Sequence, residues 1–113
     1  MIEVSITANL DKLKAEAYQQ AEEDFIQRIT EDTVEECKLE APVITGRLRD
    51  GHYSEVDGLI GYVKNDVEYA LYVIYGTDKQ PPNNYPQRAL YNIQGQYMEK
   101  FIECLRNNGV DVG

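Results

Sequence analysis

The chain has 113 residues, a length typical of one folded domain, so residues 1–113 are expected to form a single unit. Its composition, 42% apolar and 27% charged, is ordinary for a folded protein, and no apolar run approaches the roughly 20 residues that span a bilayer. A net charge of −9, from 20 acidic and 11 basic side chains, repels phosphate groups and disfavours a DNA-binding module.

The first residues alternate apolar and polar side chains. Ile2, Val4 and Ile6 are separated by Glu3 and Ser5, and this period of two predicts a short strand. The same stretch has neither a basic segment nor a long apolar core, so we expect no secretory signal and no membrane association.

Residues 11–40 lack Gly and Pro and are rich in strong helix formers, which predicts a long helix. Pro42 ends it, because the residue before a proline disfavours helical geometry. One face is apolar and carries Leu13, Ala17, Ala21, Phe25, Ile29, Val34, Cys37 and Ala41. The opposite face is acidic and carries Glu16, Glu22, Glu23, Asp24, Glu31, Asp32, Glu35 and Glu36. It is either solvated or in contact with a basic partner, and the acidity of the whole chain leaves open an ordinary surface, a surface that DNA slides past and a DNA mimic.

A β-hairpin is predicted after this helix. Thr45-Gly46 is a turn signal, and residues 47–56 have the pattern of a strand with polar spacers. Asp57-Gly58 is a strong hairpin signal, and residues 59–63 form the returning strand. Residues 67–75 are expected to form a short helix that leads into a brief extended piece.

The C-terminal part is predicted to be a loop followed by a helix. Residues 76–86 contain three prolines, and a loop this long in so small a domain is expected to project and to contact a neighbour. Residues 87–106 carry an amphipathic stripe, which predicts a second helix, capped by residues 107–109. Residues 110–113 are expected to fray. Together the elements predict an α+β fold, a small antiparallel sheet packed by a long N-terminal helix and a C-terminal helix.

No group of residues in the sequence has the make-up of an active site, which needs an activated nucleophile, a tuned acid–base pair or a metal. The single histidine, His52, has no serine or cysteine nearby that would complete a dyad, and we expect it at the surface or at a sheet edge. Cys37 and Cys104 lack a CxxC partner, so we interpret them as free thiols of a reducing cytosol, with a disulfide between them left open. The chain is therefore not expected to be an enzyme or to bind a metal or a cofactor.

The turn at Thr45-Gly46 and the two arginines after it have two interpretations. In the first, backbone N–H groups of the turn and the guanidinium groups of Arg47 and Arg49 bind an anion. In the second, which we favour in so acidic a chain, the turn needs glycine for backbone freedom. Arg47 and Arg49, two apart on a strand, then point the same way and bind carboxylates of the long helix or of a neighbouring subunit.

Nine tyrosines, against no tryptophan and two phenylalanines, are the other bias of the composition. They serve either as core residues whose hydroxyls reach water or as interface residues, because tyrosine buries area and still forms hydrogen bonds. Tyr85, inside the proline-rich loop, is the tyrosine that we expect at an interface, as an anchor placed into a neighbour.

Three segments follow one another in a fixed order. Ala41 to Arg49 reads Ala-Pro-Val-Ile-Thr-Gly-Arg-Leu-Arg, Tyr69 to Thr77 reads Tyr-Ala-Leu-Tyr-Val-Ile-Tyr-Gly-Thr, and Tyr85 to Leu90 reads Tyr-Pro-Gln-Arg-Ala-Leu. This arrangement resembles a family of small proteins of tailed bacteriophages, the tail-component, minor-capsid and head–tail neck proteins. Its members have a helix ending in Ala-Pro-Val-x-Thr-Gly-x-Leu-Arg, then Tyr-Ala-x-Tyr-Val-x-Tyr/Phe-Gly-Thr, then a proline-containing segment leading into Arg-Pro-Ala-Leu or similar.

The resemblance implies a virion structural protein, assembled in the host cytoplasm and located at the head–tail junction. There it would form a cyclic homo-oligomer that joins the head portal complex to the tail, in contact with other junction or tail proteins, while DNA passes without specific binding. The residues expected to make assembly contacts are Thr45, Gly46, Arg47, Arg49, Tyr75, Gly76, Thr77, Tyr85 and Arg88. The alternatives are an acidic DNA mimic or inhibitory binding protein from a mobile element and, more remotely, a small hydrolase.

Overall fold

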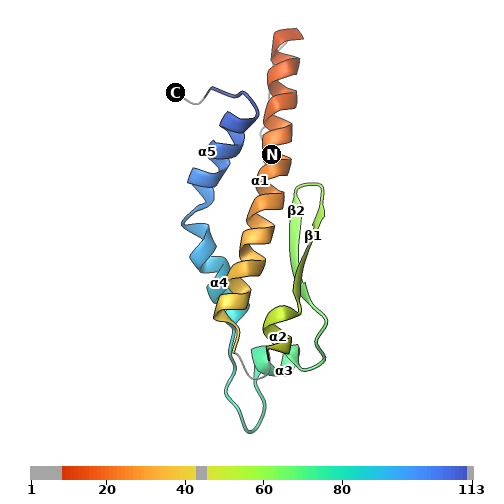
Figure 1. Ribbon diagram of the computed structural model, residues 1–113, viewed down its shortest axis with the longest axis vertical. Coiled ribbons are helices and arrows are strands. Elements are labelled where there is room, and N and C mark those ends of the chain that lie inside the picture. The colour runs from red at the N-terminus through yellow and green to blue at the C-terminus, as the bar shows by residue number, and fades with distance from the viewer. Residues whose placement is uncertain (1–8, 43–45, 112–113) are drawn as a thin grey trace.

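The computed structural model describes residues 9–42 and 46–111, with side chains from residue 15 on. Over these residues the predicted α+β fold is confirmed, with a long N-terminal helix, a two-stranded antiparallel sheet and a C-terminal helix (Figure 1). The elements in chain order are α1 Asn9–Glu40, α2 Arg47–Asp50, β1 His52–Asp57, β2 Ile60–Asn65, α3 Ala70–Tyr75, α4 Tyr85–Gln94 and α5 Tyr97–Asn107. The strand predicted from Ile2 to Ile6 lies outside the described residues.

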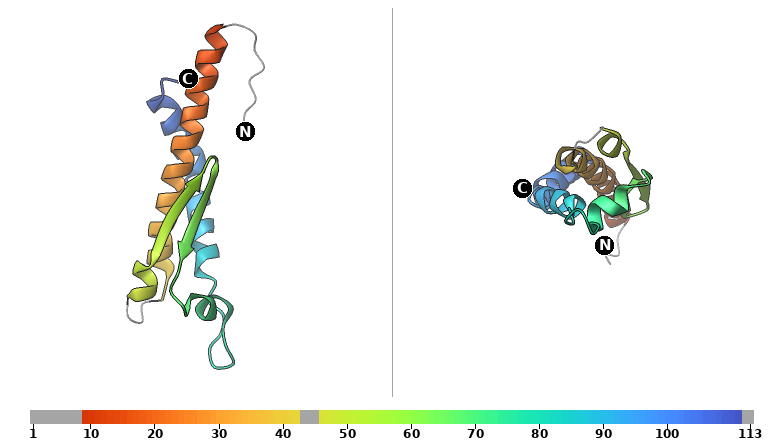
Figure 2. Two further views of the ribbon diagram at one scale, coloured as in Figure 1. Left: turned by 90° about the vertical axis from the view of Figure 1, so that its right-hand side faces the viewer. Right: turned by 90° about the horizontal axis from the view of Figure 1, so that it is seen from below.

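The helix α1 is the axis on which the other elements pack. It runs to Glu40, two residues before Pro42, and the N–H of Ala41 still donates to the carbonyl of Cys37 at 2.8 Å. The hairpin lies against one side of α1, and α4 and α5 lie against another (Figure 2). The predicted apolar face is confirmed by the buried side chains of Ala21, Ile29, Val34, Cys37 and Ala41.

The predicted hairpin is present, with Asp57 opposite Ile60 at its turn. Gly58 in this turn has a φ of 61°, a conformation that glycine adopts without strain. The hairpin approaches α1 most closely at Gly61, where the Cβ of any other residue would collide with the side chain of Thr30. Glycine at this position therefore lets the ribbon lie directly on the helix.

Residues 47–50, expected as the start of the first strand, form the helical turn α2 instead. Gly46 precedes the turn with a φ of 80°, and the N–H of Asp50 donates to the carbonyl of Gly46 at 2.9 Å. These two backbone groups are therefore not free to bond to a neighbouring strand. The first strand, β1, begins only at His52.

The predicted short helix before the loop is present as α3, but the extended piece at its end is not found. The N–H of Gly76 donates to the carbonyl of Tyr72 at 2.9 Å, which keeps the helical turn through Tyr75. Gly76 then redirects the chain with a φ of 81°, and Thr77 pairs with Gln80 in the loop that follows.

The single helix predicted over residues 87–106 is two helices. The first, α4, begins at Tyr85, because a proline in the first helical turn, here Pro86, removes no helical hydrogen bond. The break lies at Gly95, a weak helix former, directly after the end of α4. The N–H of Gln96 donates to the carbonyl of Ile93, three residues back, in a tighter turn than an α-helix has. Both helices still turn their apolar stripe towards α1.

The predicted C-terminal cap is confirmed. The N–H of Asn108 donates to a carbonyl one turn earlier at 3.2 Å, and Gly109 has a φ of 79°. Val110, expected to fray, is instead tied back, because its N–H donates to the carbonyl of Leu105 at 2.9 Å. The last two residues lie outside the described part of the chain.

The molecule is elongated, with extents of 63 × 24 × 20 Å. Its radius of gyration is 18.0 Å, against about 13 Å for a compact domain of this length. Two small cores lie along it, one around Cys37, Leu48, Ala70, Tyr85 and Ala89 and the other around Ala21, Cys104 and Leu105. Within residues 9–42 and 46–111, no helix combines the length and the apolar composition that crossing a membrane requires.

Candidate assembly surface

The residues that the sequence singled out lie at one end of the molecule. The helices α2 and α3 and the loop between α3 and α4 gather where α1 ends (Figure 1, Figure 2). The described residues of this set are Gly46, Arg47, Arg49, Tyr75, Gly76, Thr77, Tyr85 and Arg88, and Thr45 lies outside the described part.

The helix α3 presents an apolar face to solvent. Its inner side packs on the core, whereas Leu71, Tyr72 and Tyr75 are 64%, 64% and 74% exposed. Exposed apolar patches of this kind mark contact sites on folded proteins. Of these three residues, only Tyr75 was predicted from the sequence to make assembly contacts. Leu71 and Tyr72 join it only once residues 70–75 are known to be helical, because positions i, i+1 and i+4 then share one face.

The loop from Gly76 to Asn84 projects beyond the rest of this end (Figure 1). Its base is held in place: the N–H of Asn83 donates to the carbonyl of Val73 at 3.0 Å, and Arg88 donates to the amide oxygen of Asn83 at 2.8 Å. Arg88, predicted as an assembly contact, thus fixes the loop to α4 within its own chain. Residues 77–82 between these anchors are exposed.

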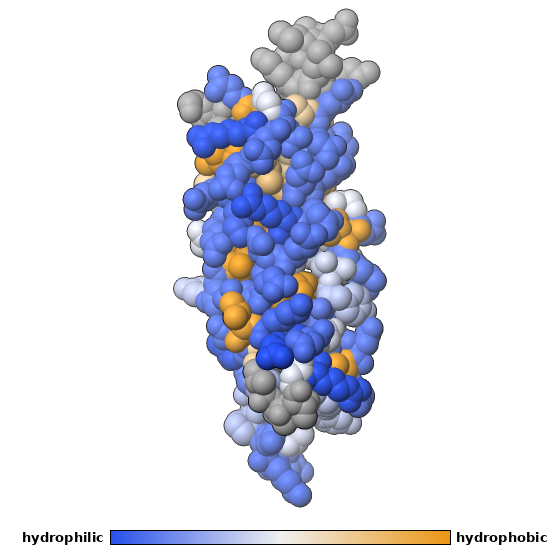
Figure 3. Space-filling view, in the orientation of Figure 1, coloured by the Kyte–Doolittle hydropathy of each residue, from blue (hydrophilic) through white to orange (hydrophobic). Residues whose placement is uncertain are grey.

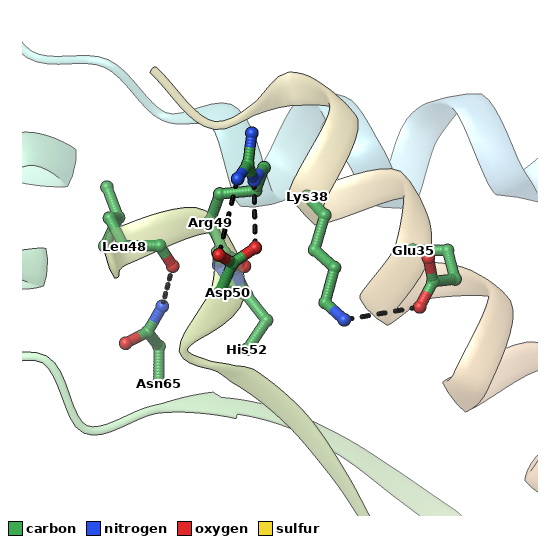
Figure 4. Close-up of polar contacts among 7 residues, drawn as sticks. All are labelled: Glu35, Lys38, Leu48, Arg49, Asp50, His52 and Asn65. Carbon is green, nitrogen blue, oxygen red and sulfur yellow. Dashed lines mark hydrogen bonds and ion pairs between the residues drawn. The ribbon is translucent and has the colours of Figure 1, made fainter. Parts of the chain in front are cut away.

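Arg47 and Arg49 do not point the same way, because they lie on a helical turn and not on a strand. Arg47 makes a two-pronged pair with Glu68, at 2.8 and 2.7 Å, and this bond holds the pKa of Glu68 below its ordinary value. Arg49 pairs with the adjacent Asp50 at 2.9 Å (Figure 4). Both arginines therefore bind carboxylates, as favoured, but those carboxylates belong to neither the long helix nor a second subunit.

His52 and Tyr85, expected at the surface and at an interface, are both buried. Tyr85 is 0% exposed and His52 is 6% exposed. The Nδ1 of His52 lies 2.9 Å from the carbonyl oxygen of Arg49, and its Nε2 lies 2.9 Å from the hydroxyl of Tyr85. A carbonyl only accepts, so Nδ1 donates to the carbonyl of Arg49, and in the neutral imidazole Nε2 then accepts from the hydroxyl of Tyr85. Burial raises the pKa of Tyr85 to about 12 and keeps it a donor.

A groove of about 620 Å³ lies between β2, α3 and α4, with α1 as its floor. Cys37 lies at this floor, and burial raises the pKa of its thiol to about 11. The thiol is therefore uncharged and unreactive at neutral pH. Cys104 is buried in the other core, and neither cysteine forms a disulfide. The interpretation of both as free thiols is confirmed.

A second, shallower depression lies at the tip of the hairpin. It has a volume of about 410 Å³ and lies where the hairpin tip meets α1 and α5. Leu59 and Met98 at its edge are 37% and 72% exposed. Its lining is apolar apart from Glu22 and consists otherwise of Phe25, Ile26, Leu59, Tyr97, Met98 and Phe101. This site was not predicted from the sequence, because its residues come from three separate segments.

The acidic face predicted for α1 is open to solvent over much of its length. Its exposed carboxylates, here called the acidic stripe, belong to Glu16, Glu23, Asp24, Glu31 and Glu35. The face drawn in Figure 3 is mostly hydrophilic, with apolar side chains in separate patches. Among the described residues, no group of three His, Cys, Asp or Glu side chains could hold a metal ion.

Compared with known protein families, with curated proteins and with solved structures, the chain matches none. The likeness to phage junction proteins therefore rests on the three sequence segments alone.

Proposed function

We propose that this chain is a structural subunit of a phage head–tail junction, which assembles with copies of itself into a ring between the head portal complex and the tail. One observation carries the proposal: the fold is a thin, elongated rod that leaves large apolar side chains exposed at several separate places. The three segments that resemble the junction family supply the biological setting.

The exposed surface is larger than a free domain of this mass normally has. The chain exposes 7880 Å², whereas about 6300 Å² is expected for a compact monomer of 12.9 kDa. An elongated subunit of this kind gains stability when neighbours cover its sides.

The apolar patches favour contact between unlike surfaces. The α3 face with Leu71, Tyr72 and Tyr75 lies at one end, whereas the depression with Leu59 and Met98 lies near the middle of α1. Association of two different surfaces of the same chain is heterologous, and such contacts close into rings when the rotation between subunits allows it. Unlike patches on one chain are therefore suited to a cyclic assembly.

The acidic stripe of α1 fits a channel through which DNA passes. Like charges repel, so a lumen lined by Glu16, Glu23 and Glu31 would let DNA slide without binding. This step of the proposal requires that the stripe face the channel, and it fails if the stripe faces outward.

The same stripe favours the second candidate, an acidic inhibitor that mimics DNA. Such a protein would be a monomer or a dimer and would compete with DNA for a basic partner. A defined larger multimer separates the ring from this candidate.

Substituting the exposed tyrosines of α3 tests the proposal. Native mass spectrometry of the unmodified chain is expected to give one discrete multimer, and the Tyr72→Ser, Tyr75→Ser double variant is expected to give monomers. The monomeric double variant should still unfold in one cooperative thermal transition, because side chains that are 64% and 74% exposed contribute little to the core. The matched control is Tyr91→Ser, a tyrosine that is 74% exposed on α4. A multimer of unchanged mass in the double variant would contradict assembly through α3.

A further inference from the structure

Among the described residues, one edge of the hairpin has no backbone partner, and this edge lies beside the groove described above. The sheet that these residues form has two strands, so β2 pairs there with β1 on one side alone. Figure 2 shows β2 between β1 and α4. In an antiparallel pair every second residue directs its N–H and C=O away from the partner strand. Within the described residues, no backbone group of another element bonds to this edge of β2.

The groove beside this edge has the shape and lining that suit an extended chain. Its volume is about 620 Å³, and it runs along β2 from Gly61 to Asn65. The apolar part of its lining includes Cys37, Val63, Val67, Ile74 and Leu90. A strand added here would bond to β2 on one side and lay every second side chain on this apolar floor.

We infer that residues 2–6 of a second copy of this chain occupy the groove as a third strand. The alternation of Ile2, Val4 and Ile6 with Glu3 and Ser5 is the pattern that such a strand needs. The three apolar side chains would face α1, and the two polar ones would face solvent. The inference rests on the proposed self-assembly and names one of its contacts.

Residues 2–6 cannot reach the groove of their own chain, because the stretch that joins them to α1 is too short. The segment that fills a groove must therefore come from another copy. The described helix begins at Asn9, and Thr33 at the groove floor lies 24 residues later, about 36 Å along a helix. The seven residue steps from Asn9 back to Ile2 span at most about 25 Å. Donation of residues 2–6 to a neighbour is a contact between unlike surfaces, and it therefore continues from subunit to subunit.

Peptide binding tests the inference. The receptor is the full chain with Val4→Pro. Proline lacks the N–H that a strand ladder needs, so residues 2–6 of the receptor cannot compete with the peptide for the groove. The probe is a fluorescent synthetic peptide of residues 1–8, and fluorescence anisotropy measures its affinity. The peptide should bind saturably, and a peptide with Val4→Pro should bind at least about tenfold more weakly, a difference of about 1.4 kcal/mol.

A blocked groove provides the matched control. Gln87 is exposed on α4 and lines the groove, so Gln87→Trp should fill it and weaken peptide binding about tenfold or more. Gln94→Trp places the same side chain on α4 away from the groove and should leave binding unchanged. No binding, or equal binding of both peptides, would overturn the inference.

The native mass of the full-length Val4→Pro chain separates this inference from the proposed function. A multimer that persists in Val4→Pro would overturn strand donation while leaving ring assembly in place. Saturable peptide binding by an unmodified chain that never multimerises would show that the groove accepts a strand, but it would overturn both donation by a second copy and ring assembly.

Discussion

Replacing Tyr85 with alanine is expected to lower the free energy of unfolding by about 3–5 kcal/mol, enough to leave little folded protein in a small domain. Tyr85 is 0% exposed and is the largest fully buried side chain of the core that joins α1, α2, α3 and α4. Its loss removes the packing that holds the start of α4 on α1 and leaves His52 without a donor. Chemical denaturation followed by circular dichroism measures the change.

Two further variants separate packing from the hydrogen bond. Tyr85→Phe keeps the ring but leaves the buried Nε2 of His52 unsatisfied, so a loss of about 1–3 kcal/mol is expected. Tyr91→Ala, on the same helix but 74% exposed, should change stability by less than about 0.5 kcal/mol. A Tyr85→Ala chain that stays fully stable and only loses its multimer would restore the role of Tyr85 as an interface anchor.

Replacing Gly61 with alanine is expected to destabilise the fold by about 1–3 kcal/mol, because it forces the hairpin away from α1. An added Cβ would lie 1.8 Å from the hydroxyl oxygen of Thr30 and 3.0 Å from its Cβ. That hydroxyl donates to the carbonyl of Ile26 at 2.6 Å, so moving it also breaks a bond on a buried side chain. The thermal midpoint of the variant should fall.

The collision predicts a specific rescue. Thr30→Ala removes the oxygen that the new methyl group would meet, so the double variant should recover part of the loss, with a coupling of about 0.5–3 kcal/mol. The control is Gly95→Ala, where the nearest atom lies 4.0 Å from an added Cβ and the effect should be neutral or slightly stabilising. Additive losses at Gly61 and Thr30 would mean that the two do not collide.

Local sequence patterns were enough to predict most helices and the hairpin. The wrong predictions arose where one residue type is compatible with two kinds of structure. The helix α1 and the turn at Gly58 have strong signals of composition and spacing. Pro86 led to the expectation of a loop, yet proline is equally suited to the first turn of a helix, which is where it lies. Because Pro86 was assigned to a loop, Tyr85 was also assigned to that loop, and its position in the core was not predicted.

The candidate site was predictable only in part, because the residues that interact there come from segments far apart in the sequence. Arg47 was expected to bind a carboxylate, but Glu68 lies 21 residues away and sequence alone gives no distance between them. His52 lies at the start of β1, where a polar residue normally suggests an edge, and its burial depends on the hydroxyl of Tyr85. The groove between β2 and α4 exists only once both are placed on α1.

Electron microscopy of the purified multimer tests the central claim most directly, because it shows both the symmetry and the centre of the assembly. The account predicts closed rings of one size with an open channel and, at higher resolution, the acidic stripe of α1 lining that channel. Compact particles without a channel, open filaments or monomers alone would contradict it.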